Sequence, residues 1–319
     1  MSNIRLFYRE SLSLNLTATL DKSQSHYVSK VMRIKENEVF SLFNNSGEWE
    51  AKILTISKNI VGWIPGEGVT EASVELRDNN EGNGNYQFSI LGVRDVISKE
   101  NSNLFSQFSI HTQEINKDTR YIGNLGLGYR FLNSDESLML GANSFYDKDI
   151  QEGHSRISYG LEAKAAIIDF SFNQYFKTSN QKVISGTKEQ VLSGNEYNLS
   201  SQVPYMPWST FNLQGYRLEN EKSKNDQKGY VYSLENTLTP SLQLNIELDR
   251  SKVDGTKDEY NYELVFNYPP KENKYSLSEK ALSEEAFEKR NMQAALKEKV
   301  RRNNNLAVEI QGSVIFTSK

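Results

Sequence analysis

The residue types that most often perform catalysis or bind metals are few in this chain of 319 residues. It contains no cysteine, which excludes thiolate chemistry and a disulfide framework. Its three histidines, His26, His111 and His154, fall in unrelated segments, with no paired carboxylates beside them at metal-ligand spacing. We therefore expect structural or exposed histidines, no metal site and no cofactor.

Two short motifs carry residue types that occur in functional sites. Asp147 and Asp149 alternate at a strand end like a loose divalent-ion site, but alternating acids in a turn are usually only solvated. Gly123–Gly128 is rich in glycine, yet no helix follows it, and a phosphate loop needs that helix. No nucleophile, base and acid are arranged together. We expect no catalytic residues, no small-molecule substrate and a protein that is not an enzyme.

A pattern of alternating side chains sets the positions of these residues. Between Tyr121 and Phe131, every second residue is apolar or aromatic, whereas the intervening residues are small or polar. The same division recurs from Arg156 to Lys164. Polar clusters at 133–136 and 151–154 are rich in turn-forming residues. A side-chain period of two indicates β-strands with two different faces, joined into a strand-turn-strand meander.

The composition is compatible with a barrel in an outer membrane. Hydrophobic residues make up only 37% of the chain and the mean hydropathy is −0.63, yet there are 17 tyrosines and 15 phenylalanines. Many aromatic residues argue against disorder, and no run of about 18 apolar residues predicts a helical membrane span. A β-barrel hides from hydropathy because alternate residues face a wet lumen. The net charge of −4 gives no global basic field for nucleic acid.

The two strand faces separate a membrane barrel from a soluble β-sandwich, which would also alternate. Tyrosine and phenylalanine gather near strand ends on the apolar face, which suits aromatic girdles. The polar face is rich in glycine, asparagine and serine, which suits a lumen. Eleven strands can be counted, and the even strand number of bacterial barrels makes twelve the nearest consistent count. The missing strand would be Ala72–Leu76 or lie within Gln181–Asn195.

The alternation predicts which side chains face the lumen and which face lipid. The predicted lumen-facing residues are Asn124, Arg130, Asn143, Arg156, Glu162, Lys164, Asn173, Glu247 and Glu263. The predicted lipid-facing residues are Leu125, Leu127, Tyr129, Leu140, Ile157, Tyr159, Leu161, Phe170, Phe172, Leu244, Ile246, Tyr262 and Leu264.

The amino-terminal residues differ from this pattern, because helix and strand signals occur together. Asp21–Ile34 begins with a good N-cap residue and has apolar residues at helical spacing, which predicts a short amphipathic helix. Two strands, Glu38–Phe43 and Glu48–Ser57, follow it and are joined by the turn Asn44–Gly47.

The stretch HYVSKVMRIKENEVFSLFNNSGEWEAKI, residues 26–53, resembles the amino-terminal, PUA-like RNA-binding domain of the bacterial small-subunit rRNA uracil-N3 methyltransferase family. The resemblance implies RNA as a partner, with His26, Lys30 and Arg33 facing it. The alternative is that the basic residues form only the solvated side of a helix, since three basic side chains do not make a footprint. Nothing after residue 62 resembles that family's methyltransferase domain, which binds S-adenosylmethionine.

Several motifs of the β region occur together and in order. They are TRYIGNLGLGYRF (119–131), the stretch from Leu140 to Phe176, the segment Gln202–Pro204 and RRNNNL followed by AVEI (301–310). Over about residues 100–312 the chain resembles the β-domain of the inverse autotransporters, the intimin/invasin family. This implies a twelve-stranded outer-membrane barrel whose carboxy-terminal passenger threads the lumen to the cell surface. It also implies membrane lipid, barrel-assembly machinery and periplasmic chaperones as partners.

The carboxy-terminal part of the chain is predicted to contain one long helix, Ser276–Arg301, because apolar residues recur there near helical spacing. This helix would be a plug or linker at or in the barrel, or would pack on the periplasmic rim. Only residues 303–319 follow it, so we expect a barrel that lacks its passenger.

These observations predict a mainly β protein: an antiparallel transmembrane barrel of about twelve strands with a carboxy-terminal helix, preceded by a small α+β domain. The expected divisions are a PUA-like domain at 1–61, a linker at 62–85, the barrel at 86–270, and a linker helix with a terminal strand at 271–319.

The two resemblances imply different compartments. The barrel implies the outer membrane, whereas the amino-terminal domain is of cytoplasmic type and no secretory signal peptide precedes it. We therefore expect a translocator or anchor fused to an rRNA-methyltransferase-like domain, with the joint near residue 62 reflecting a fusion, truncation or mis-joined reading frame. The alternative is an rRNA-binding protein, derived from a methyltransferase without its catalytic domain, that carries a soluble β scaffold.

Overall fold

The structure of the protein is a computed structural model. It describes residues 5–8, 20, 24, 39–45, 47–52, 68–78, 85–220, 226–252, 258–271, 275–310 and 313–315. The chain divides into two compact units, Met1–Ile60 and Val61–Lys319. The RNA-facing candidates His26, Lys30 and Arg33 lie outside the described residues, as does most of the predicted helix at 21–34.

The first unit contains a three-stranded sheet. Its strands are β1 (Arg5–Phe7), β2 (Val39–Asn44) and β3 (Gly47–Lys52), in the order β1-β2-β3. β1 is parallel to β2, and β2 and β3 form the antiparallel hairpin that the sequence predicts. Phe40 and Leu42 on β2 are buried, so one face of this sheet supports a small core.

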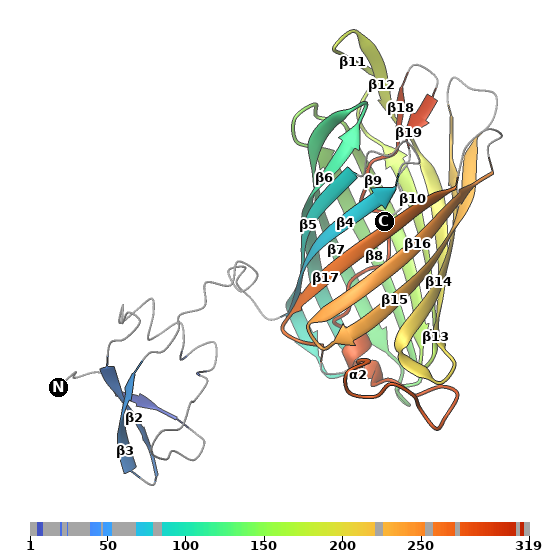
Figure 1. Ribbon diagram of the computed structural model, residues 1–319. Coiled ribbons are helices and arrows are strands. Elements are labelled where there is room, and N and C mark those ends of the chain that lie inside the picture. Colours follow the sequence, from blue (N-terminus) through green and yellow to red (C-terminus); the bar gives the residue numbers. More distant parts are fainter. Residues whose placement is uncertain are drawn as a thin grey trace. The chain divides into compact units, whose positions relative to one another are not determined.

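The second unit is a closed antiparallel barrel of twelve strands (Figure 1), as predicted. In chain order the strands are β4 (Gly68–Asp78), β5 (Asn85–Lys99), β6 (Ser102–Ile115), β7 (Asp118–Leu132), β8 (Leu138–Asp149), β9 (Ser155–Ala165), β10 (Ile168–Lys177), β13 (Gly194–Val203), β14 (Met206–Leu218), β15 (Gln227–Thr239), β16 (Leu242–Ser251) and β17 (Glu259–Tyr268). Each strand pairs with its neighbours in the chain, and β10 pairs with β13 across a longer connection. Closure leaves no unpaired edge within the wall.

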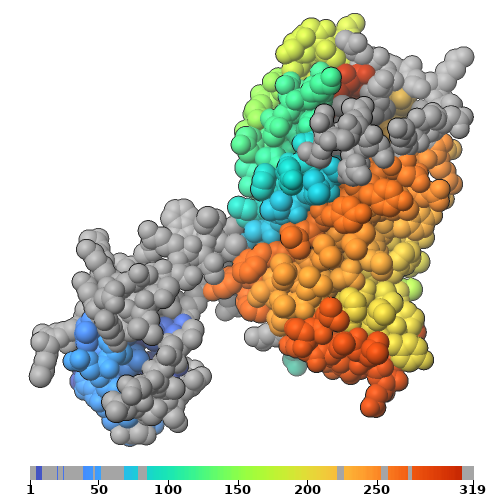
Figure 2. Space-filling view, viewed as in Figure 1, coloured from blue at the N-terminus to red at the C-terminus, as the bar shows by residue number. Residues whose placement is uncertain are grey.

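Strand β4 closes the barrel by pairing with β17 on one side and β5 on the other. Figure 2 shows this closure as the cyan surface of β4 lying against the orange surface of β17. β4 contains Ala72–Leu76, one of the two predicted positions of the twelfth strand. It also lies within the stretch 62–85 that was predicted as a linker, so the barrel begins at Gly68 and not at residue 86.

The other predicted position also forms strands, but outside the barrel wall. β11 (Lys182–Ile184) and β12 (Thr187–Val191) form a hairpin between β10 and β13. With β18 (Val308–Ile310) and β19 (Ser313–Ile315) they build a second sheet in the order β11-β12-β18-β19. The carboxy-terminal chain is therefore joined to a hairpin that the barrel supplies at one rim.

The prediction of a long helix at Ser276–Arg301 is wrong. The only helix that the structure assigns within this segment is the single turn α2 (Met292–Ala295). Before α2, only an isolated turn forms, in which Lys280 donates to the carbonyl of Ser276. Other backbone groups bond to the β13–β14 turn: Tyr205 donates to the carbonyl of Ala286, and Ser283 donates to the carbonyl of Tyr205. Contacts with the barrel thus replace the hydrogen bonds that a helix would make. No helix in the described part of the chain is long and apolar enough to cross a membrane.

Candidate functional site in the barrel lumen

The barrel lumen contains part of its own chain. After α2 at one rim, residues Leu296–Ala307, here called the luminal segment, run inside the barrel and lead to β18 at the other rim (Figure 1). Residues 302–309 are all buried. The segment contains no helix or strand, so its backbone polar groups are not paired with one another as they would be in a helix. Buried and unpaired backbone groups are costly, so the wall must supply their partners.

Side chains of β6 supply several of these partners. Gln107 accepts a hydrogen bond from the N–H of Val300 at 2.7 Å. Gln113 accepts from the N–H of Leu306 at 2.9 Å and donates to its carbonyl at 2.8 Å. The amide of Gln113 therefore bonds the segment as a neighbouring strand would. Sequence reasoning did not identify either glutamine, although both belong to the alternating inward set of β6.

Strands β7, β9 and β10 bond the carbonyls of the segment. Asn124 donates to the carbonyl of Asn304 at 3.0 Å and Arg156 to that of Asn303 at 2.6 Å. Asn173 donates to the carbonyl of Arg301 at 3.0 Å. Arg130 donates to the carbonyl of Leu296 at 3.2 Å and is paired with Glu162 at 2.9 Å. The inward polar side chains of these strands therefore form a binding surface for the backbone of the luminal segment.

Three basic side chains of the segment pair with acids on separate parts of the wall. Lys299 contacts Glu71 of β4 at 2.6 Å, and Arg301 contacts Glu235 of β15 at 2.5 Å. Arg302 contacts Asp147 of β8 at 2.6 Å. Arg302 and Asp147 are fully buried, and Arg156 also contacts Asp147, at 2.7 Å. Such an arrangement is stable only because each buried charge has an opposite charge and hydrogen bonds.

The expectation that Asp147 and Asp149 are only solvated is therefore wrong. Both are fully buried, and Asp149 lies 3.4 Å from Arg120. The signal was available in the sequence, because both acids lie an even number of residues from Asn143, which was predicted to face the lumen. Arg156, a partner of Asp147, lies directly opposite it on β9, but the other partner, Arg302, was not predictable because it is 155 residues away in the chain.

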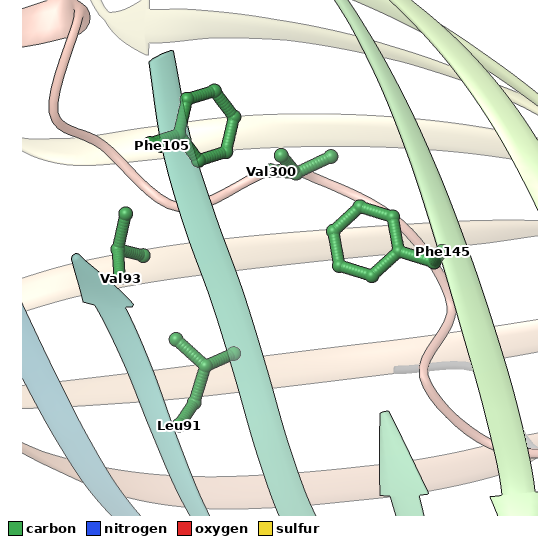
Figure 3. Packing of buried hydrophobic residues seen from close by; sticks show 5 residues of the cluster. All are labelled: Leu91, Val93, Phe105, Phe145 and Val300. Carbon is green, nitrogen blue, oxygen red and sulfur yellow. The ribbon is translucent and has the colours of Figure 1, made fainter. Parts of the chain in front are cut away.

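An apolar contact fixes the middle of the segment. Val300 packs among Leu91, Val93, Phe105 and Phe145, which reach it from β5, β6 and β8 (Figure 3). The two rings also contact cations, with the Phe105 ring 4.3 Å from the guanidinium of Arg130. Aromatic faces inside this polar lumen therefore pack against both apolar and cationic groups.

The glycine-rich stretch of β7 makes room for these rings. A Cβ atom added at Gly126 would lie 2.3 Å from the ring of Phe145, and one at Gly128 would lie 2.3 Å from the ring of Phe105. The glycines are needed for space beside the rings, and no phosphate-binding role is required to explain them.

A buried ionic cluster holds the hairpin that meets the emerging chain. Glu189 of β12 accepts hydrogen bonds from Arg120 at 2.6 and 2.8 Å. His154, in the β8–β9 turn, lies 3.5 Å from the same carboxylate. Burial lowers the pKa of His154 below its ordinary value of 6.5, although Glu189 opposes this shift. His154 is a buried structural residue in this cluster.

The predicted sets fall on opposite sides of the wall. The side chains of Asn124, Arg130, Asn143, Arg156, Glu162, Lys164 and Asn173 are buried, and Glu247 and Glu263 line a cavity beside the luminal segment. Most of the predicted lipid-facing residues are exposed, from 37% for Leu140 to 61% for Leu125. Ile157, Phe172 and Leu244 are half-buried. The structure thus separates the two sets by side-chain exposure.

Comparison with known proteins gives the family. Residues 48–304 match the β-domain of the inverse autotransporters. The chain belongs to this family. Residues 20–61 match the RNA methyltransferase PUA domain. Both resemblances inferred from the sequence are confirmed, and membership of the inverse autotransporter family, together with the closed barrel, supports an outer-membrane location.

Two curated relatives support the assignment. The chain is 25% identical over 173 residues to an invasin of Yersinia enterocolitica, a match that covers 51% of the chain and 20% of the invasin. It is 27% identical over 146 residues to an attaching and effacing protein homolog of Escherichia coli, which covers 43% of the chain and 48% of that protein. The matched region is thus less than half the length of either relative.

A solved structure has the same fold. It comes from a study of the in-meso crystallization of membrane proteins, and it aligns with a TM-score of 0.60 at 20% identity. The alignment covers 76% of this chain and all of that one. At this identity the similarity supports the architecture alone.

The glycines of β7 give a test of the packing around the luminal segment. We expect Gly126→Ala and Gly128→Ala each to destabilise the barrel by about 1 to 3 kcal/mol, because the added methyl group overlaps a ring that cannot retreat through the wall. Gly123→Ala is the matched control on the same strand, since its Cβ would lie 3.7 Å from Ile150, an ordinary contact. Urea unfolding in detergent measures the three variants. Equal stability of all three would contradict the proposed role of these glycines.

Proposed function

We propose that this chain is the outer-membrane anchor and translocator of an inverse autotransporter, holding a carboxy-terminal segment in transit to the cell surface. The observation that supports this most is the luminal segment itself, which enters beside α2 and reaches β12 at the opposite rim. By this proposal the rim at α2 is periplasmic and the rim at the β11–β12 hairpin faces outward. Family membership supports the same direction of threading.

The polar side chains of the lumen explain how the barrel could hold the luminal segment. Buried backbone groups of the segment are bonded by Gln107, Gln113 and Asn173, so the segment does not need a helix or a partner strand in the lumen. Its bases pair with Glu71 and Asp147 on separate strands. A segment bound by these hydrogen bonds and ion pairs would resist being pulled out of the lumen.

Surface exposure of the carboxy terminus tests the proposal. The full chain would be expressed in Escherichia coli behind a secretory signal peptide, with an epitope after Lys319. We expect antibody to label the epitope on intact cells, because the threaded chain leaves the barrel at the rim of β12. An epitope placed before Met1 is the control and should be labelled only after the outer membrane is permeabilised. Labelling of the amino-terminal epitope alone would overturn the proposal.

The same proposal assigns lipid to the outer face of the wall. Leu127 and Leu161 are 59% and 60% exposed there. Leu127→Arg or Leu161→Arg should cost about 2 to 4 kcal/mol of unfolding free energy in lipid bilayers if the residue lies near the midplane. Val183→Arg is the control, because Val183 is 66% exposed on β11, outside the wall. If both wall variants were as stable as the control, water and not lipid would surround the barrel.

A second function, RNA binding by the amino-terminal unit, is favoured by the match of residues 20–61 to the RNA methyltransferase PUA domain. His26, Lys30 and Arg33 would contact the RNA backbone. Filter binding with a small-subunit rRNA fragment would test this. We expect binding that weakens with salt and in a Lys30→Ala, Arg33→Ala variant. Binding that is unchanged in that variant would reject these residues as the RNA contact.

A further inference from the structure

The luminal segment leaves part of the lumen unfilled. A cavity of about 110 Å³ lies between the segment and the wall formed by β4, β5 and β13–β17. Its lining includes five carboxylates, from Glu71, Glu75, Glu235, Glu247 and Glu263, and three cationic side chains, from Lys299, Arg301 and Arg302. Two further cations contact these acids from outside the lining, Arg77 at 2.9 Å from Glu75 and Lys271 at 3.5 Å from Glu71. The space is large enough for several water molecules.

The strand register gathers these acids into rows. Glu235 of β15 lies opposite Asn245 of β16, which lies opposite Glu263 of β17, which lies opposite Glu75 of β4. Adjacent strands are about 4.8 Å apart, so this row sets carboxylates and amides side by side.

A second row runs beside the first, two residues further along each strand. It places Asn212, Ser233, Glu247 and Asn261 opposite one another in turn. Two hydrogen bonds link acids and amides across β16 and β17: Asn261 donates to Glu247 at 3.0 Å, and Asn245 donates to Glu263 at 2.9 Å. Because the amide nitrogens of Asn261 and Asn245 donate these bonds, the orientation of each amide oxygen is fixed.

Two amide oxygens of the second row, those of Asn212 and Asn261, have no hydrogen-bond partner among the described residues. Asn261 is 3% exposed and Asn212 is 4% exposed, both line the cavity, and the side-chain oxygen of each accepts no hydrogen bond from the described residues. A buried carbonyl oxygen without a donor is unfavourable. Such an oxygen can be satisfied by water or by a cation, but not by an anion.

We propose that this cavity binds a hydrated divalent cation, Ca²⁺ or Mg²⁺, beside Glu247, Glu263 and the side-chain oxygen of Asn261. Carboxylate, amide and water oxygens are the ligands that these hard cations prefer. The carboxylates of Glu247 and Glu263 would also attract a divalent charge. Among the described residues, no group of three or more His, Cys, Asp or Glu side chains is placed to hold a metal, so amide oxygens and water complete the shell.

Calcium titration of the purified full chain tests this site. After removal of metals with EDTA, the folded protein in detergent would be titrated with CaCl₂ by calorimetry, and with MgCl₂ in a parallel series. We expect one Ca²⁺ or Mg²⁺ per chain, with affinity reduced on the order of tenfold or more in a Glu247→Gln, Glu263→Gln variant, because ligand charge sets affinity at such sites. The matched control is Glu100→Gln, Glu152→Gln, which removes an exposed and a half-buried carboxylate from two turns outside the cavity lining and should bind the cation as the unmodified chain does.

A single substitution keeps the test decisive if the double variant does not fold. Asn261→Ala removes the unpartnered oxygen without changing the charge of the cavity, and we expect a smaller but measurable loss of affinity. No binding of either cation by the unmodified chain would overturn the proposal. Equal affinity of the unmodified chain and the variants would overturn it as well, because the ion would then bind elsewhere.

Discussion

The need to hydrogen-bond the backbone of a chain segment that is enclosed by a barrel governs this structure. A strand in a barrel uses its backbone groups to bond its two neighbours, so the wall can offer only side chains to anything in the lumen. The luminal segment Leu296–Ala307 contains no helix or strand, and few of its backbone groups bond to one another. The inward side chains therefore act in place of neighbouring strands, and Gln113, which both donates to and accepts from Leu306, does so most fully. The types of side chain that line the lumen are therefore explained by hydrogen bonding to the luminal segment as much as by contact with water.

The same constraint explains why the lumen mixes charges, amides and aromatic rings. Amides bond the backbone of the segment, while acids such as Asp147 hold its bases. Phe105 and Phe145 give Val300 an apolar contact and lie where Gly126 and Gly128 leave space. A lumen built only for water would not require rings of this size to be matched to glycines on the adjacent strands.

Much of the wall could be predicted from sequence because a side-chain period of two is a local property. The alternation gave eleven strands, the even strand number of bacterial barrels raised this to the twelve observed, and the same alternation divided residues such as Arg130 and Leu127 between the two faces. The carboxy-terminal segment could not be predicted in this way. Its spacing of apolar residues suits a helix, but its polar groups find partners on strands more than 100 residues distant, and those contacts outweigh helix propensity. The alternation of β8 placed Asp147 on the inward face with Asn143, but its ion pair with Arg302, 155 residues away, could not be read from a local pattern.

Three of the four basic residues of the luminal segment also bear on the order in which the barrel folds and unfolds. Within the four residues 299–302, the side chains of Lys299, Arg301 and Arg302 pair with acids on three different strands, β4, β15 and β8. These three ion pairs can form together only after the barrel has closed and the segment lies in the lumen. Interactions that are absent from the folding transition state slow unfolding more than they speed folding. The segment thus contributes to the kinetic lifetime of the closed barrel, and the barrel is most persistent when its lumen is occupied.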